Sequence, residues 1–233
     1  MRLRFRPEQA CKEHGLQGYG LMRRVVNVVL GLMALCLTAQ PVHAGGSTVL
    51  ALGDSLTAGY GLDQADAFPV QLQAALRADG HDVTVINAGV SGDTSAGGRS
   101  RLDWLLSADV DAVIVELGAN DGLRGIEPTE TRANLDWILA TLQARGLPTL
   151  LSGMLAPPNL GQDYGREFNA LYPALAEKYG VPLDPFFLEG VAADAALNLA
   201  DGLHPNRAGV AIIVRRLAPQ VIELLARSDQ PKP

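Results

Sequence analysis

Ser55 is the first residue of this chain that could act as a nucleophile. It follows the apolar run of residues 49–52 and the pair Gly53-Asp54, so we expect a buried strand that ends where the hydroxyl is presented. Open α/β sheets bind their ligands at the carboxyl ends of the strands. A serine hydroxyl is a weak nucleophile unless a base takes its proton, and Gly-Asp-Ser can equally be a polar turn. The meaning of Ser55 therefore depends on what the rest of the chain brings to it.

His204 is the candidate for that base. Of the four histidines, two precede residue 45, and His81 lies in a polar turn ahead of a predicted strand, where a solvated side chain is expected. Asp201, three residues before His204, can accept a hydrogen bond from one ring nitrogen while the other nitrogen faces Ser55. Asp201 and His204 could also be ordinary loop residues before a C-terminal helix. The three residues together predict the nucleophile, base and orienting carboxylate of an acyl-transfer site.

Two further loops could stabilise an oxyanion. Gly92 precedes a predicted helix, so its amide can turn toward a ligand, and Asn120 follows a predicted strand with a side-chain amide that is free to donate. With the backbone amide of Ser55 they would form the oxyanion hole that acyl transfer needs. Each residue also has a plainer interpretation, since Gly92 can serve a tight turn and Asn120 can be a turn residue at a strand end. The neighbouring acids Asp93 and Asp121 are expected to stabilise a helix start and a loop rather than to react.

Alternating strand-like and helix-like segments are expected to position these loops. Such alternation predicts an α/β fold, a three-layer α/β/α (flavodoxin-like) arrangement with a five-stranded parallel sheet. Right-handed crossovers would bring the carboxyl ends of all strands to one edge, where the four polar loops meet. The predicted strands are residues 48–52, 83–88, 112–117, 149–152 and 181–183. The predicted helices are residues 69–79, 94–106, 129–145, 166–179 and 206–227.

Residues 1–44 are predicted to be a signal peptide rather than part of the domain. Arg23 and Arg24 precede a mostly apolar run over residues 25–37, and Val-His-Ala at residues 42–44 suits cleavage after Ala44. Translation from Met22 would produce a more ordinary signal. An uncleaved anchor is the alternative, although the run is short for a membrane span. We therefore expect a periplasmic or secreted domain at residues 45–233.

The composition of residues 45–233 restricts its partners. The leader contains six of the 19 Lys and Arg residues and two of the 25 Asp and Glu residues, so the remainder has a net charge near −10. Such a charge disfavours nucleic acid and anionic membrane surfaces. Both cysteines lie in the leader, so the exported domain is expected to depend on its core rather than on disulfides.

The chain resembles the GDSL or SGNH hydrolases in four blocks that occur in the family's order. These are residues 53–56 (Gly-Asp-Ser-Leu), 91–94 (Ser-Gly-Asp-Thr), 118–121 (Gly-Ala-Asn-Asp) and 201–205 (Asp-Gly-Leu-His-Pro). The resemblance covers about residues 48–218. It implies Ser55 as nucleophile, His204 as base and Asp201 as orienting residue. It also implies an oxyanion hole made by the amides of Ser55 and Gly92 and the side chain of Asn120.

Residues 53–61 and 115–125 are most similar to the periplasmic thioesterase, lysophospholipase and arylesterase branch of that family. This resemblance implies hydrolysis of carboxylic esters and thioesters through an acyl-enzyme. Branches that remove acetyl groups from carbohydrates share the same blocks, so a carbohydrate O-acetyl esterase is the alternative. Apolar loops favour short-to-medium acyl chains. We expect Asp54, Leu123, Met154 and Pro157 to contact the substrate. Phe186 and Phe187 could either line the site or belong to the core.

The expected partner is a small acyl ester or thioester. We expect no nucleic acid, no stable membrane insertion, no cofactor and no metal, because no cluster of His, Cys and carboxylates has the spacing of metal ligands. A monomer is expected. A binding module with an inactive triad and a peptidase are the rival functions, and a peptidase side activity is compatible with the same site.

Overall fold

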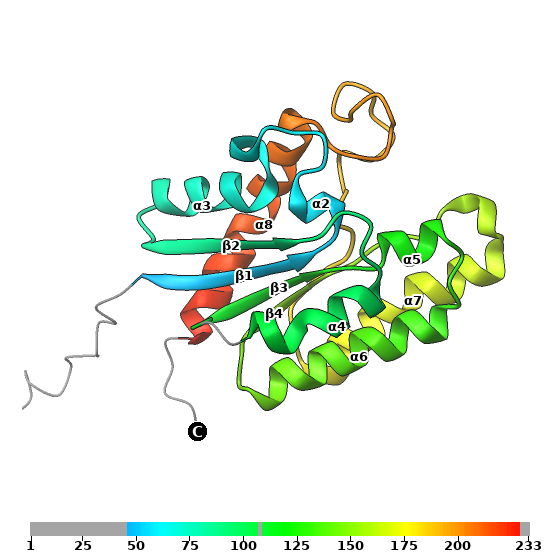
Figure 1. The fold of residues 1–233 in the computed structure, drawn as a ribbon, viewed down its shortest axis with the longest axis horizontal. Coiled ribbons are helices and arrows are strands. Elements are labelled where there is room, and N and C mark those ends of the chain that lie inside the picture. Colours follow the sequence, from blue (N-terminus) through cyan, green and yellow to red (C-terminus); the bar gives the residue numbers. More distant parts are fainter. Residues whose placement is uncertain (1–45, 107–108, 229–233) are drawn as a thin grey trace, which may run out of the picture. The chain divides into compact units, whose positions relative to one another are not determined.

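Five parallel strands form the centre of the part of the chain that the structure describes (Figure 1). The computed structural model describes residues 46–106 and 109–228, so the predicted leader lies outside the described residues. The strand order is β2-β1-β3-β4-β5. The strands are β1 (Ser47–Gly53), β2 (Val83–Gly89), β3 (Ala112–Glu116), β4 (Thr149–Ser152) and β5 (Leu183–Asp184). The predicted five-stranded parallel sheet is confirmed.

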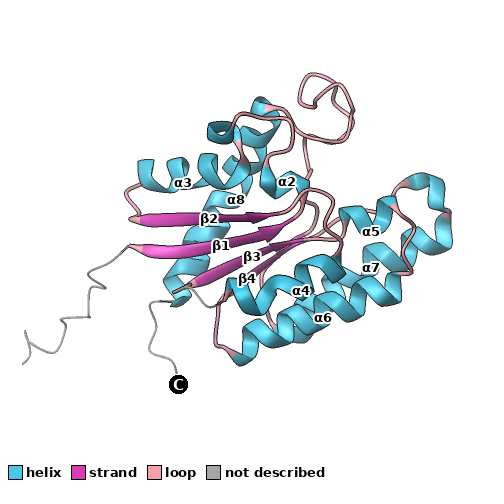
Figure 2. Cartoon of the chain, viewed as in Figure 1, coloured by secondary structure: helices cyan, strands magenta, loops and turns pink. Residues whose placement is uncertain are grey.

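Helices cover both faces of this sheet, as the cyan ribbons in Figure 2 show. One face is covered by α3 (Phe68–Ala78) and α8 (Arg207–Ser228), which pack against each other. The other face is covered by α4 (Ser95–Leu105), α6 (Pro128–Ala144) and α7 (Gln162–Tyr179). None of the described helices is long and apolar enough to span a bilayer.

The apolar strands explain why the sheet is buried on both faces. All five residues of β3 and all four of β4 are buried, and β1 is buried from Val49 to Gly53. A sheet between two helical layers has no solvated face, so its strands read as continuous apolar runs. Of the buried polar residues in β3 and β4, Thr149 is the first residue of β4, whereas Glu116 and Ser152 are the last residues of their strands. Polar side chains therefore gather at one edge of the sheet.

Short helices at that edge were not predicted. They are α2 (Ser55–Ala58) and α5 (Ala119–Leu123), with 3-10 turns η1 (Gln64–Asp66) and η2 (Pro158–Leu160). Four or five residues are too few to show a helical repeat in sequence.

Helix α7 begins four residues earlier than predicted. A glycine such as Gly165 disfavours a helix, so the sequence predicts a later start. The Tyr164 ring, however, stacks on Phe168 one turn further along, with 5.7 Å between the ring centroids. The Tyr164 hydroxyl also donates to the Ile126 carbonyl. A contact within the helix and a hydrogen bond to Ile126 therefore extend α7 through a residue that sequence propensity disfavours.

Candidate active site

The turn between β1 and α2 presents Ser55. Gly53 ends β1, Asp54 is the N-cap of α2 and Ser55 is its first residue. The Asp54 carboxylate accepts from the Leu56 amide at 3.0 Å, so one of the unpaired N–H groups at the helix start is satisfied. We call residues 53–58 the nucleophile turn. It places the Ser55 hydroxyl at the carboxyl edge of the sheet, where the sequence predicts it.

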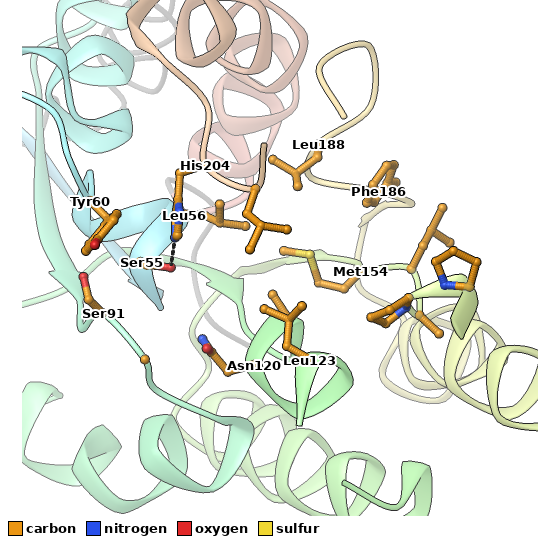
Figure 3. Close-up of a pocket in the computed structure, with 17 residues that line it drawn as sticks. Ser55, Leu56, Tyr60, Ser91, Asn120, Leu123, Met154, Phe186, Leu188 and His204 are labelled. Atoms are coloured by element: carbon orange, nitrogen blue, oxygen red, sulfur yellow. Dashed lines mark hydrogen bonds between the residues drawn. The ribbon is translucent and has the colours of Figure 1, made fainter. Parts of the chain in front are cut away.

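His204 and Asp201 lie in a hydrogen-bonded row with Ser55. The His204 Nε2 atom is 2.9 Å from Ser55 Oγ (Figure 3). The Nδ1 atom of the same ring is 2.7 Å from Asp201 Oδ2. In the tautomer that carries its proton on Nδ1, the imidazole donates to Asp201 and accepts from the Ser55 hydroxyl. Residues separated by 149 positions in the chain therefore make a direct contact.

Backbone hydrogen bonds hold Asp201 in its ionised form. Its Oδ1 atom accepts from the amides of His204 and Leu203 at 3.0 and 2.9 Å. These backbone donors, together with the His204 ring, lower the pKa of Asp201 to about 2. A carboxylate that stays charged can orient the imidazole and stabilise its protonated form.

The loop before α8 fixes the position of His204. The His204 carbonyl accepts from the Leu199 amide at 2.8 Å, and Asn198 forms an antiparallel bridge with Pro205. Asn206 caps α8 through its side-chain oxygen, which accepts from the amides of Ala208 and Gly209. The base is thus presented by a loop anchored to the long C-terminal helix.

Tyr60 is a site residue that sequence reasoning missed. Its ring centroid lies 4.5 Å from that of His204, and 52% of the residue is exposed. Figure 3 shows Tyr60, His204 and Ser91 around the Ser55 hydroxyl. The only available signal was an aromatic residue five positions after Ser55, inside residues 53–61.

Asn120 lies near the nucleophile but is not free, contrary to expectation. Its Nδ2 atom is 3.1 Å from Asp54 Oδ2 and 2.9 Å from the Asp93 carbonyl. An amide nitrogen has two hydrogens, so both are directed at protein acceptors. A hydrogen bond from Asn120 to a substrate oxyanion therefore has to replace or share one of these contacts. Gly92 lines the same cavity, with φ of +86°.

Asp54, which the sequence predicts to contact the substrate, lies beneath the cavity rather than in its wall. The residue is fully buried and is absent from the cavity lining. Burial raises its pKa to about 6, although hydrogen bonds from Leu56 and Asn120 oppose the shift. Its carboxyl group supports the site from below by holding Asn120 and the start of α2.

Arg101 joins the ends of two strands to the Gly92 loop. Its Nε donates to Asp93 at 2.7 Å, and its two terminal nitrogens donate to the carbonyls of Ala88 and Gly53 at 2.6 and 2.8 Å. Arginine suits this task because its planar fork presents donors in fixed directions. The nucleophile turn and the Gly92 loop therefore share one charged support.

An apolar cavity of about 480 Å³ opens beside Ser55. Leu123, Met154 and Pro157, which the sequence predicts to contact the substrate, are among the residues that line it. Phe186 also lines it, whereas Phe187 is fully buried and packs edge-on against Phe68 in the core at 5.1 Å between centroids. The remaining lining residues are Ser55, Leu56, Tyr60, Ser91, Gly92, Ala119, Asn120, Leu155, Ala156, Pro158, Leu188, Leu203 and His204.

Metal ligands are not grouped in this part of the chain. Among residues 46–106 and 109–228, no cluster of three or more His, Cys, Asp or Glu side chains is arranged to hold an ion. The described site therefore offers a hydroxyl, an imidazole and a carboxylate in a row, next to an apolar space. This arrangement suits nucleophilic attack on an acyl group.

Comparison with known proteins agrees with this chemistry. The model of the GDSL-like Lipase/Acylhydrolase family matches residues 51–212. Esterase TesA of Pseudomonas aeruginosa is 41% identical over 196 residues, which cover 84% of this chain and 96% of that protein. Thioesterase 1/protease 1/lysophospholipase L1 of Escherichia coli K12 is 40% identical over 183 residues, covering 78% of this chain and 86% of that protein. The crystal structure of AlinE4, an SGNH-hydrolase family esterase, is 49% identical with a TM-score of 0.66, covering 78% of this chain and 98% of that chain.

Proposed function

Since the chain belongs to the GDSL-like lipase/acylhydrolase family and is a hydrolase of ester bonds, we propose that it cleaves carboxylic esters and thioesters through an acyl-enzyme at Ser55. The observation that carries the proposal is the row Ser55–His204–Asp201, with separations of 2.9 and 2.7 Å, at the wall of an apolar cavity. The names of the relatives, esterase and thioesterase, support the same reaction class.

The proposed reaction has two steps. Ser55 attacks the acyl carbonyl while His204 takes its proton, and the alcohol or thiol leaves with that proton. Water, deprotonated by His204, then attacks the acyl-enzyme and releases the acid. The amides of Ser55 and Gly92 and the side chain of Asn120 are the proposed donors to the oxyanion in both steps.

The cavity supports an acyl chain as the recognised part of the substrate. Leucine, methionine, proline and phenylalanine side chains dominate its wall, and each methylene that they bury contributes about 0.8 kcal/mol. Short-to-medium acyl esters and thioesters are the proposed substrates. A carbohydrate O-acetyl esterase would need a wall that recognises hydroxyl groups, so the apolar lining disfavours that alternative.

The proposal includes export. Residues 1–44 are proposed to be a signal peptide cut near Ala44, on the evidence of Arg23-Arg24 and the apolar run that follows. Residues 45–233 would then act as an acidic monomer in the periplasm or outside the cell. The proposed partner is a small acyl ester or thioester. We propose neither binding of nucleic acid nor stable insertion into a membrane.

The test is hydrolysis of p-nitrophenyl esters from acetyl to decanoyl and of the matching acyl thioesters. We expect kcat/KM to rise up to about fourfold per methylene until the cavity is filled, which corresponds to about 0.8 kcal/mol per methylene. Ser55→Ala should lower kcat by about 10³-fold or more. Activity confined to acetylated sugars would contradict the proposed substrate class.

A matched control is available on α4. Ser100 is exposed and its hydroxyl donates to the Gly97 carbonyl within the same helix. Ser100→Ala makes the same chemical change away from the cavity, so it should keep full activity. A fluorophosphonate probe should label the wild type and Ser100→Ala but not Ser55→Ala. Failure to label the wild type would favour a binding module with an inactive triad.

A further inference from the structure

Glu116 is a buried acid that the reaction does not use directly. It is the last residue of β3, is fully buried and lies next to Gly53 of β1 in the sheet register. Burying a carboxyl group is costly unless its hydrogen bonds are satisfied. Its Oε1 atom has no hydrogen-bond partner among the described residues. Such an exception in a well-packed core needs an explanation.

The hydrogen bonds that the Glu116 carboxyl group accepts from the described residues all come from the nucleophile turn. Its Oε2 atom accepts from the Thr57 hydroxyl at 2.6 Å and from the Asp54 amide at 3.4 Å. Asp54 and Thr57 are the residues on either side of the pair Ser55-Leu56. One oxygen atom from a neighbouring strand thus holds both ends of the segment that carries the nucleophile.

Gly53 leaves the space that this contact requires. A Cβ atom on Gly53 would lie 2.0 Å from Thr57 Oγ1 and 2.6 Å from Glu116 Oε2, which is far closer than atoms can approach. The glycine at the end of β1 and the acid at the end of β3 therefore form one packing arrangement beneath Ser55.

Asp54 connects Glu116 to Asn120, the proposed side-chain donor to the oxyanion. The Asp54 carboxylate accepts from Leu56 N and from Asn120 Nδ2 at 3.0 and 3.1 Å. Burial and the nearby charge of Asp54 raise the pKa of Glu116 well above its ordinary value, so Glu116 is the member of this pair that keeps its proton. A neutral Glu116 still offers a carbonyl oxygen to Thr57 and leaves the negative charge on Asp54, next to Asn120.

We propose that Glu116 is a positioning residue for acyl transfer, whose buried carboxyl group fixes the nucleophile turn and, through Asp54, the orientation of Asn120. The proposal rests on the proposed function of Ser55. Glu116 touches neither the cavity nor the substrate site, so its removal should affect kcat rather than KM. A displacement of about 1 Å at the reacting atoms is enough to cost about 10²-fold in rate.

The experiment compares Glu116→Met with Glu116→Gln on the best p-nitrophenyl ester. Methionine keeps the volume but removes the acceptor, so kcat should fall 10- to 100-fold while KM stays within twofold. Glutamine keeps a carbonyl oxygen for Thr57 and Asp54, so it should restore kcat to within about threefold of the wild type. Thermal unfolding of each variant separates a displaced site from a lost fold.

Thr57→Val tests the same contact from the other side. It should lower kcat without changing KM, and the double variant with Glu116→Met should be no slower than Glu116→Met alone, because both remove one interaction. Thr149→Val is the matched control: Thr149 is a buried threonine in β4 that donates to the Leu147 carbonyl. It should lower stability and leave kcat unchanged.

Three outcomes overturn the proposal: Glu116→Met with kcat within twofold of the wild type, Glu116→Gln as slow as Glu116→Met, or Thr57→Val indistinguishable from Thr149→Val. If Glu116→Met does not fold, the two threonine variants decide. A wild type without ester hydrolysis would instead defeat the proposed function. An active wild type with unaffected variants would defeat this inference alone.

Discussion

Asp54 lies beneath the site, where burial makes its ionised form unfavourable. Burial raises its pKa from the ordinary value of 3.8 to about 6. The folded protein therefore binds this proton more tightly than the unfolded chain does. Stability from this group is fully present below pH 4 and is lost as the pH rises through about 6. Near neutral pH the buried carboxylate is charged, which lowers the free energy of unfolding. In this charged form it accepts a hydrogen bond from Asn120.

Asp54→Asn should separate these two effects. The variant cannot ionise, so between pH 4 and pH 7 the wild type should lose stability relative to it, on the order of 3 kcal/mol for a shift of this size. At the same time kcat should fall, because the amide replaces with a donor one of the two oxygens that accept from Leu56 N and Asn120 Nδ2. Urea unfolding at both pH values and ester hydrolysis at pH 7 measure the two effects.

A pH-independent stability difference between the two proteins would contradict the raised pKa of Asp54. Unchanged kcat in a folded Asp54→Asn variant would show that the Asp54–Asn120 contact does not orient the oxyanion donor.

At the scale of elements, the site depends on how closely α2 approaches the strand ends. Gly53 and Gly89 face each other in the register of β1 and β2. A Cβ atom on Gly89 would lie 2.2 Å from the Ala58 amide, and the corresponding atom on Gly53 would overlap Thr57. A side chain at either position would therefore lift the nucleophile turn away from the sheet.

Gly53→Ala should consequently be severe. Because its methyl group meets Thr57 Oγ1 and Glu116 Oε2, we expect a loss of about 2–4 kcal/mol in stability or a displaced turn with little activity. Gly165→Ala is the control, since Gly165 lies inside α7 with open space around it. That variant should be neutral or more stable by about 0.5–1 kcal/mol.

Denaturant midpoints and ester hydrolysis of both variants test this claim. A Gly53→Ala protein with wild-type stability and activity would mean that the turn is more tolerant than its packing indicates.

At the scale of the whole molecule, the acyl cavity is assembled from segments that follow all five strands of the sheet. The loop after β3 contributes Leu123, the loop after β4 contributes Met154 and Ala156, and the loops after β5 contribute Phe186 and His204. Figure 3 shows Leu123, Met154, Phe186 and His204 around the space beside Ser55. Chain-length preference is therefore a property of the tertiary arrangement.

Ala156→Phe should shorten this cavity. The phenylalanine ring occupies space that the acyl chain would fill. We therefore expect kcat/KM for an octanoyl ester to fall about tenfold or more, because each excluded methylene loses about 0.8 kcal/mol. The value for the acetyl ester should stay within about twofold. Ala74→Phe places the same ring on the exposed surface of α3 and should change neither value. Rates on esters from acetyl to decanoyl measure the profile.

A profile that falls equally for all chain lengths would indicate that the acyl group binds elsewhere and that Ala156→Phe merely disturbs the fold.

Much of the site could be predicted because its residues follow strand ends. Ser55, Gly92, Asn120 and His204 each follow an apolar run or precede a long helix, and a parallel sheet brings the segments after its strands to one edge. Glu116 was missed as a support because a charged residue at the end of a buried strand has no distinctive spacing. Tyr60 was missed because its role depends on a ring contact with a residue far away in the chain.

The sequence by itself determined the fold class, the family and the three residues proposed for the chemistry, because hydrophobic runs and polar motifs are local signals. Only the tertiary structure decided that Asp54 is buried beneath the site, that Asn120 is already hydrogen-bonded, and that Phe186 lines the cavity while Phe187 lies in the core. These outcomes depend on which atoms approach within a few ångströms after folding. Such contacts form between strands and loops that are far apart in the chain, so no local sequence pattern predicts them.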